Sequence, residues 1–256
     1  MVKQWAPIYL NKNQKFEFTD ELSNGKIPAI VLKKAFSLKT CKKITQKILN
    51  FNYITDGPGI DKKIGESLNS YLNQKETYFK KTELTDTKLE NYFGTIDDPR
   101  IVMQKLLSII FQKKISVAKE NNLNYSKGVF RVHSSGTFNI HRDCARFEAS
   151  NYKVSNFPLQ FSATLHLQKA ECGGELILYK KFWQQEDEKY RFPHFGYSKE
   201  VVTNTEFLKI KPDVGDIIII NPLHYHTISE IKGMSDRVST GFFFAPSDEH
   251  ALVCWS

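Results

Sequence analysis

The side chains with the clearest chemical potential lie in the second half of the chain. His141 and Asp143 are separated by one residue, and in an extended segment residues i and i+2 point to the same side. An imidazole and a carboxylate would therefore converge on one point. They are two of the three ligands of the facial triad that binds iron(II) and leaves other coordination positions of the metal open. His226, which follows the apolar run Ile217–Ile220, could complete that triad. We predict a metal site formed by His141, Asp143 and His226.

A second pair of residues is suited to binding a carboxylate. Arg237 and Ser239 follow His226 and share one face of the next extended segment. A guanidinium stays charged and forks onto a carboxylate with two parallel hydrogen bonds, and a hydroxyl on the same face adds a third donor. The pair could hold the distal carboxylate of a small diacid whose other end is bound to the metal. A surface ion pair of Arg237 with Asp236 or Glu230 is the structural alternative.

The predicted strand Leu159–Gln168 alternates between apolar and polar residues. Its apolar face is expected to pack against helices, and its polar face to look into a barrel. The apolar positions are Phe161, Ala163, Leu165 and Leu167, and the polar positions are Ser162, Thr164, His166 and Gln168.

The first half of the chain is predicted to be mainly helical. A strand is expected over Ile27–Phe36, a helix capped by Ser37 over about Leu38–Leu49, and short helices within 64–94. Asp98-Pro99 is a good helix start, and apolar residues recur at helical spacing from there to about Glu120.

From Gly128 onwards the pattern changes to short strands separated by turn residues. Helices followed by a run of strands predict an α+β fold, with an antiparallel sandwich or barrel backed by helices in one domain. The expected strands are Val129–His133, Leu159–Gln168, Glu175–Tyr179, Val201–Val202, Asp216–Ile220, Tyr225–Ile228 and Val238–Phe244.

Composition excludes several classes of protein. The 256 residues are 41% hydrophobic and 25% charged, which are ordinary globular values, and the longest apolar run is far short of a bilayer span. With no apolar leader visible, we expect a cytoplasmic protein without a membrane partner. The four cysteines form no C-x-x-C pair, so neither a disulfide framework nor a cysteine-rich zinc site is expected. The net charge of +8 comes from scattered lysines of the first half, which predict solvated helix faces and not a nucleic-acid site.

Taken together, the motifs resemble the iron(II)/2-oxoglutarate-dependent oxygenases. The resemblance rests on His141-x-Asp143, His226, Arg237-x-Ser239 and the segment LHLQKAECGGEL at 165–176. Further segments are similar to the group containing the freestanding hapalindole-type aliphatic halogenases and their hydroxylase relatives. These segments are GDIIIINPLHYHTISEIKG, RVSTGFFFAPS, Tyr125–Arg131, Tyr179–Trp183 and the final Cys254-Trp255-Ser256.

The resemblance implies a double-stranded β-helix core, of jelly-roll or cupin-like form, over residues 128–256. Residues 1–127 would be mainly helical support and a substrate cap within a single oxygenase domain spanning 1–256. The cofactors would be Fe(II), 2-oxoglutarate and O2, with the metal on His141, Asp143 and His226 and the far carboxylate on Arg237 and Ser239.

The resemblance also ranks the remaining candidates. The family's Tyr-His-x-Ile form at 225–228 favours His226 over His224, which has the same strand parity. His166 and Thr164 are candidate cosubstrate contacts, with a buried structural histidine as the alternative for His166. Arg131 is a candidate substrate contact, with a structural ion pair as the alternative.

The predicted activity is hydroxylation of a freestanding small molecule, an amino acid or a natural-product intermediate, with release of succinate and CO2. The halogenases of this group have a small residue where Asp143 stands, and chloride fills the vacated iron position. The carboxylate present here therefore favours hydroxylation. Substrate specificity is expected from the N-terminal helices and from Phe182–Lys199.

Two alternatives remain open. An oxygenase of the same superfamily could act on nucleic acid or protein, but the nucleic-acid demethylases show a second arginine shortly after the cosubstrate arginine, and Arg237 is the last arginine here. A non-catalytic cupin-type metal-binding or sensor protein is the other alternative, although a pure metal site has no need for Arg237-x-Ser239.

Overall fold

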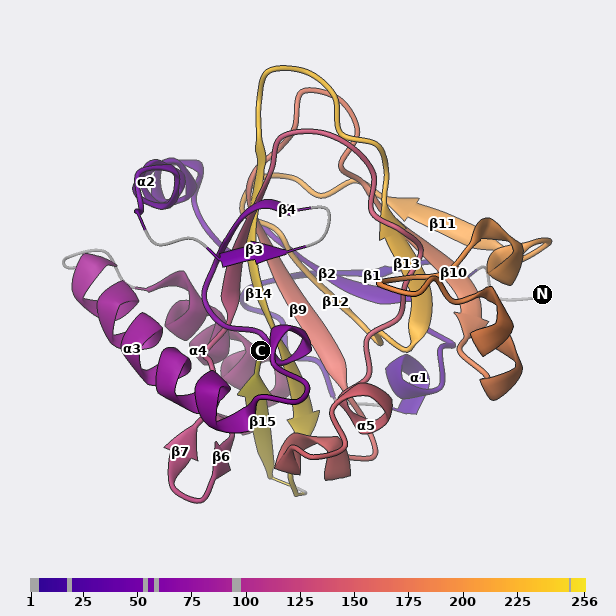
Figure 1. The fold of residues 1–256 in the computed structure, drawn as a ribbon. Helices are drawn as coiled ribbons and strands as arrows, with labels where there is room; N and C mark the ends of the chain where they lie inside the picture. The colour runs from indigo at the N-terminus through magenta and orange to yellow at the C-terminus, as the bar shows by residue number, and fades with distance from the viewer. Residues whose placement is uncertain (1–4, 18–19, 53–54, 58–59, 94–97, 249) are drawn as a thin grey trace.

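The computed structural model describes residues 5–17, 20–52, 55–57, 60–93, 98–248 and 250–256 (Figure 1). The helices are α1 (Asp20–Ser23), α2 (Leu38–Leu49), α3 (Lys75–Phe93), α4 (Pro99–Phe111) and α5 (Ala145–Glu148). Short 3-10 helices lie at Leu68–Ser70, Lys153–Asn156, Gln185–Tyr190 and Lys199–Val202.

The strands are β1 (Ile8–Asn11), β2 (Ala29–Lys33), β3 (Thr55–Gly57), β4 (Ile60–Ile64), β5 (Lys114–Val117), β6 (Lys119–Glu120), β7 (Leu123–Asn124), β8 (Val129–His133), β9 (Phe161–Gln168), β10 (Leu176–Phe182), β11 (Phe207–Ile210), β12 (Ile217–Ile220), β13 (His224–Ile228), β14 (Arg237–Pro246) and β15 (Ala251–Trp255). The prediction of a fold that mixes helices with extensive sheet is confirmed.

Two sheets build the centre of the molecule. The larger one has the order β1-β2-β12-β9-β14-β8-β4-β3, and β15 joins it by pairing with β14 and with β5. The smaller one has the order β11-β10-β13. Within the described strands the pairing is antiparallel except for β1 with β2 and β15 with β5.

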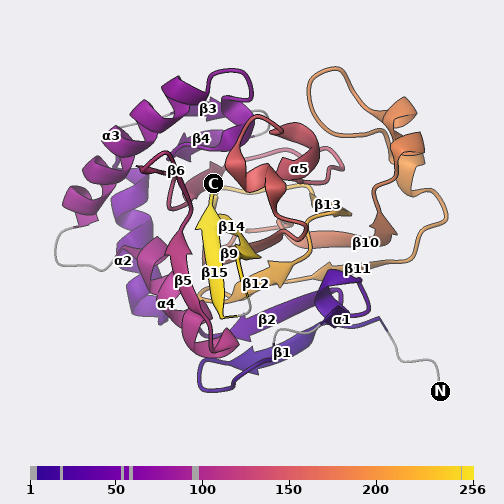
Figure 2. The ribbon, with the colours of Figure 1, turned by 90° about the horizontal axis from the view of Figure 1, so that it is seen from below.

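The run of four isoleucines in β12 shows how the layers are stacked. Ile217 and Ile219 belong to the core shared with α2 and α4, whereas Ile218 and Ile220 pack with Leu176 and other residues of the smaller sheet. A strand buried on both faces reads as a continuous apolar run because each side of its pleat meets another layer. Figure 2 shows the helices α2, α3 and α4 on one side of the larger sheet and β10, β11 and β13 on the other.

The helix predicted over Leu38–Leu49 is confirmed as α2. The Ser37 side chain accepts a hydrogen bond from the Thr40 backbone N–H, which satisfies one of the free donors of the first turn. Cys41, Ile44 and Ile48 are buried at helical spacing on the face that packs against β9. The apolar residues of β9 form that shared core, as its alternation predicted.

The helix predicted from Asp98-Pro99 begins there but ends earlier than expected. Asp98 accepts from the Arg100 backbone N–H, and α4 stops at Phe111 instead of continuing to about Glu120. Gln112 adopts a left-handed conformation that ends the helix, and Lys114–Val117 then pairs with β15 in the larger sheet. A strand pairing almost 140 residues away along the chain therefore overrides the local helical pattern.

Other elements also differ from the sequence-based expectation. Residues 75–93 form one long helix instead of several short ones, and Val201–Val202 lies in a 3-10 turn instead of a strand. The first half of the chain also supplies β1 to β5 to the larger sheet, so helical support describes only part of it. Across the described ranges, no helix combines the length and apolar character that crossing a bilayer requires.

Candidate metal centre and adjoining cavity

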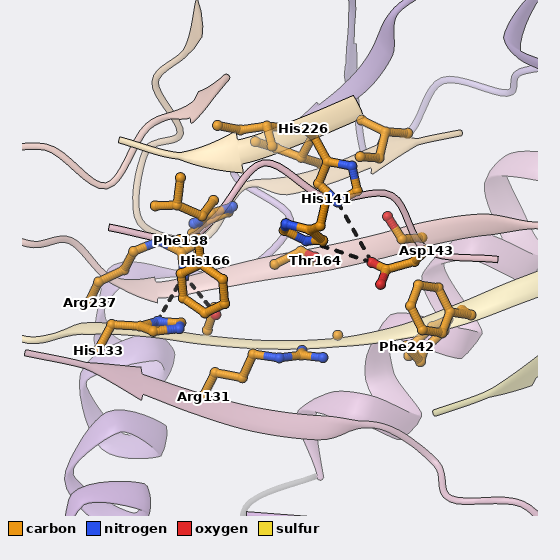
Figure 3. Close-up of a pocket in the computed structure, with 18 of the residues that line it drawn as sticks. Arg131, His133, Phe138, His141, Asp143, Thr164, His166, His226, Arg237 and Phe242 are labelled. Atoms are coloured by element: carbon orange, nitrogen blue, oxygen red, sulfur yellow. Dashed lines mark hydrogen bonds and ion pairs between the residues drawn. The ribbon is translucent and has the colours of Figure 1, made fainter. Parts of the chain in front are cut away.

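A cavity of about 140 Å³ lies between the two sheets (Figure 3). Its walls come from β8, β9, β12 and β14 of the larger sheet, from β10 and β13 of the smaller sheet, and from the segment that leads to Asp143. The structure brings all eight residues predicted for the site to this cavity. They are Arg131, His141, Asp143, Thr164, His166, His226, Arg237 and Ser239.

Three of these residues form a compact cluster of possible metal ligands. One Asp143 carboxylate oxygen lies 3.6 Å from His226 Nε2 and 3.9 Å from His141 Nε2. The possible ligand atoms of the three residues all lie within 4.8 Å of one another. Two imidazoles and one carboxylate are the donor set of non-haem iron(II) oxygenase sites, in which part of the coordination sphere stays open. The donor set and its spacing fit such a metal.

Backbone pairing fixes the positions of these ligands. His141 and His226 exchange two backbone hydrogen bonds of 2.9 and 2.8 Å, and the Asp143 N–H donates to the Pro222 carbonyl at 2.9 Å. The segment 141–143 is thereby held against the start of β13, so residues far apart in the sequence converge.

The two imidazoles are oriented so that the correct nitrogen faces the cluster. His141 Nδ1 lies 2.8 Å from the Asn139 carbonyl oxygen, and His226 Nδ1 lies 2.8 Å from the His224 carbonyl oxygen. Because a carbonyl oxygen only accepts hydrogen bonds, each Nδ1 carries the hydrogen, and each Nε2 presents its lone pair. This is the arrangement that orients metal-binding histidines.

Arg142, the residue between two of the candidate ligands, points the opposite way. Its side chain is buried between Trp183 and Phe147, with the guanidinium carbon 4.5 Å from the Trp183 ring centre, and it donates to Glu148 at 3.1 Å. Anchoring Arg142 outside the cavity keeps His141 and Asp143 turned inward. The i, i+2 spacing of the motif works through this alternation.

The electrostatics keep the carboxylate ionised and His141 neutral. Burial would raise the pKa of Asp143, but the adjoining His226 ring and the nearby His141 and Arg131 lower it to about 2. Burial, with the nearby His226, lowers the pKa of His141 to about 4, against the opposing effect of Asp143. An ionised carboxylate beside a neutral imidazole is the state in which both groups bind a metal ion.

Arg237 lies at another side of the cavity with spare hydrogen-bonding capacity. It is 5% exposed, and one terminal nitrogen lies 3.3 Å from both Ser239 Oγ and His133 Nδ1. Its Nε is buried and has no partner among the described residues. Burial and the nearby Arg131 lower the pKa of Arg237 to about 10, so it remains charged at neutral pH. A buried guanidinium with an unpaired donor fits a carboxylate ligand.

The polar face of β9 looks into the cavity, as its alternation predicted. Ser162, Thr164 and His166 line it, and burial lowers the pKa of His166 well below its usual range. His166 and Arg237 also border a second cavity of about 350 Å³ beside the Gly173–Gly174 turn. The two residues therefore form part of the wall between the cavities.

The choice between His224 and His226 is clear from their surroundings. His226 faces Asp143, whereas His224 packs against the Phe182 ring at 3.9 Å between ring centres, and its Nδ1 lies 2.9 Å from the Tyr179 carbonyl oxygen. His224 is buried, and its backbone carbonyl orients His226.

His133 is the member of the site that the sequence did not reveal. It stands directly opposite Arg237 in the β8–β14 pair, and burial with the nearby Arg237 and Arg131 lowers its pKa to about 3. Neutral His133 accepts a hydrogen bond from Arg237 and so fixes the guanidinium. Its i, i+2 spacing from Arg131 was the available signal, but the cross-strand register was needed to interpret it.

The expected sources of specificity contribute unequally. Phe195, from the segment Phe182–Lys199, packs against the His141 ring at 5.0 Å between ring centres. The described residues before 128 supply no side chain to the cavity wall.

Comparison with known proteins gives consistent results. The family described as carrier-protein-independent halogenase WelO5 matches residues 10–256. The leucinostatins biosynthesis cluster protein S of Purpureocillium lilacinum is 29% identical over 126 residues, which cover 44% of this chain and 51% of that protein. The match thus spans about half the length of that curated relative.

The fold is shared with an N-substituted L-amino acid dioxygenase from Burkholderia ambifaria AMMD. That structure is 15% identical, with a TM-score of 0.64 over 92% of this chain and 89% of the other. The complex of that enzyme with alpha-ketoglutarate is 16% identical, with a TM-score of 0.62 over the same shares. The family match covers nearly the whole chain, and the enzymes of this class use Fe(II), 2-oxoglutarate and O2. The chain therefore belongs to the carrier-protein-independent halogenase WelO5 family, within the iron(II)/2-oxoglutarate-dependent oxygenase superfamily.

Proposed function

We propose that this protein is a dioxygenase that hydroxylates an unactivated carbon of a freestanding small molecule. The observation that carries the proposal is the Asp143 carboxylate, which faces both His141 and His226 at less than 4 Å. In the halogenases of this group chloride takes the position of that carboxylate. With the position filled by the protein's own ligand, hydroxylation is the expected outcome.

The roles of the site residues follow from their contacts. His141, Asp143 and His226 would hold iron(II), and Arg237 with Ser239 would hold the far carboxylate of 2-oxoglutarate. With O2, the bound iron(II) and 2-oxoglutarate would supply an oxidant strong enough to attack a C–H bond, with succinate and CO2 as by-products. His133 keeps the Arg237 guanidinium in place, and Thr164 and His166 offer further polar contacts to the cosubstrate.

The apolar part of the wall has a separate role. Ile218, Ile220, Ile228 and Phe242 line the cavity beside the polar cluster. Such walls exclude bulk water and hold the carbon skeleton of a substrate in one orientation. We assign this chemistry to a single oxygenase domain spanning residues 1–256, with a double-stranded β-helix core.

The proposed substrate is an amino acid derivative or a natural-product intermediate. Support comes from the biosynthesis-cluster relative and from the fold shared with an enzyme that acts on N-substituted L-amino acids. The cavity of about 140 Å³, lined by both polar and apolar side chains, suits a small molecule. A non-catalytic metal-binding or sensor protein is the less favoured alternative, because it gives no function to the buried, unpaired Nε of Arg237.

Product analysis tests the proposal. The iron-loaded protein would be incubated with 2-oxoglutarate, O2, chloride and a panel of N-substituted L-amino acids, and products would be examined by mass spectrometry. We expect one oxygen atom to be gained per succinate released. A product that gains chlorine from the wild-type protein would overturn the assignment and favour the activity after which the family is described.

A further inference from the structure

Arg131 is the charged side chain of the cavity wall for which the proposed function provides no role. It projects from β8 into the cavity, and Figure 3 shows it reaching toward the side where Asp143 lies, while Arg237 lies at the opposite end. Its cross-strand neighbours are Ser239 on β14 and Lys63 on β4. The Arg131 guanidinium therefore lies on the Asp143 side of the cavity.

The guanidinium of Arg131 has no hydrogen-bond or ion-pair partner among the residues that the structure describes. Burial lowers its pKa, and among the described residues the charge that favours its charged form is that of Asp143, which is assigned to the metal. Lys63 adds to the crowding of positive charge, because burial and Arg131 lower the pKa of Lys63 to about 8, against the opposing effect of Glu66. Enclosed arginines normally fork onto a carboxylate, so Arg131 lacks its counter-ion.

The arginines and the aspartate that line the cavity support the same conclusion. They are Arg131, Arg237 and Asp143. The proposed metal would engage Asp143 and the proposed cosubstrate would engage Arg237, which leaves Arg131 without an anion. A carboxylate carries one negative charge at pH 7, whereas a phosphate ester carries about 1.5 to 2.

We propose that Arg131 binds a free carboxylate of the substrate, so that the substrates are small organic acids with one free carboxylate. The assignment rests on the proposed function, because it takes Asp143 and Arg237 to be engaged by the metal and the cosubstrate. Arg131 is then a specificity-determining residue that orients the apolar part of the substrate along the wall formed by residues such as Phe242.

Calorimetric titration of matched probes tests this inference. N-acetyl-L-leucine and its neutral amide, N-acetyl-L-leucinamide, would be titrated without O2 into the protein loaded with iron(II) and 2-oxoglutarate. We expect the wild-type protein to prefer the acid by at least tenfold and Arg131→Gln to bind the acid about thirty-fold more weakly, as expected for losing one side of a desolvated charge pair. Arg146→Gln, which removes an exposed arginine on α5, is the matched control and should retain the preference.

Several results would overturn the inference. They are equal binding of acid and amide by the wild-type protein, binding of neither probe, and an acid preference that survives in Arg131→Gln. A loss of 2-oxoglutarate affinity in Arg131→Gln would also overturn it, because the carboxylate bound would then be that of the cosubstrate.

Two controls separate this test from folding defects and from failure of the proposed function. Arg131→Gln removes an uncompensated charge, so the melting temperature of the ligand-free variant should not fall below that of the wild type. A wild-type protein that fails to bind 2-oxoglutarate would refute the proposed function itself, whereas failure of the Arg131 assignment leaves that binding intact.

Discussion

Replacing Gly174 with alanine tests how the Gly173–Gly174 turn controls the cosubstrate site. Gly174 has a φ of +75°, and an added Cβ would lie 3.1 Å from Arg237 Cδ and 3.8 Å from Arg237 Nε. The first distance is shorter than ordinary carbon–carbon contact, so the arginine side chain must shift by a few tenths of an ångström. The glycine therefore both permits the turn and leaves room for the guanidinium.

Two separate effects are expected from Gly174→Ala. The left-handed backbone conformation costs an alanine about 1–2 kcal/mol of folding free energy. Displacement of the Arg237 fork should weaken 2-oxoglutarate binding about tenfold, which corresponds to about 1.4 kcal/mol. Gly136→Ala separates the two effects, because Gly136 has a φ of +90° and an added Cβ there meets nothing within 4 Å.

The assay is anaerobic titration of the iron-loaded proteins with 2-oxoglutarate, together with urea unfolding of each variant. Both variants should lose similar stability, but Gly174→Ala alone should bind the cosubstrate more weakly. If Gly174→Ala binds 2-oxoglutarate as tightly as Gly136→Ala does, then Arg237 does not hold the cosubstrate in the orientation seen here.

Three further predictions concern the ligands, the carboxylate fork and acid stability. Asp143→Ala should weaken iron binding, measured by equilibrium dialysis, by more than the roughly 10–100-fold typical of losing a residue that only hydrogen-bonds to a metal ligand. The same variant should lose hydroxylation. Hydroxylation at the wild-type rate would show that Asp143 is not a ligand. Arg237→Gln should weaken 2-oxoglutarate binding by about 2–5 kcal/mol, and Arg237→Lys should lose less of this binding energy. Unchanged binding in Arg237→Gln would show that the cosubstrate carboxylate is not bound by Arg237. Burial lowers the pKa of His224 to about 4 in the folded protein, below its unfolded value of about 6.5. Its contribution to stability is therefore complete above pH 6.5 and is lost as the pH falls towards 4, at up to about 1.4 kcal/mol per pH unit. Urea unfolding of metal-free His224→Asn should show a correspondingly smaller loss between pH 6.5 and 4, and an identical pH profile would contradict the burial argument.

The site residues could be predicted because strand parity and chemistry agree. The alternation of β9 placed Thr164 and His166 on the cavity side, and the spacing of His141 and Asp143 put both on one side of an extended segment. His226 and Arg237 were proposed from their positions after the apolar strand Ile217–Ile220, and the resemblance then favoured His226 over His224. His133 was missed because its role depends on its position opposite Arg237 in the β8–β14 pair. That strand register is set by the three-dimensional structure and cannot be inferred from the local sequence.

The helical half was less predictable for physical reasons. The buried face of α3 includes Thr82, Thr85 and Asp86, so polar residues interrupt the apolar periodicity that would indicate one long helix. Asp86 is buried because it pairs with the fully buried Arg100 at 2.5 Å, a contact between two helices. Val201 and Val202 resemble a strand locally, but they pack from a 3-10 turn against Tyr225.

The most direct test of the central claim is an anaerobic visible titration of the metal-free protein with iron(II) and then with 2-oxoglutarate. We expect a charge-transfer band between metal and cosubstrate that appears in the wild-type protein and is absent from His226→Ala. His224→Asn, which alters the neighbouring histidine outside the cluster, should retain the band. Bound iron without a band in the wild-type protein, or a band that persists in His226→Ala, would contradict the assignment of His226 as an iron ligand beside the cosubstrate.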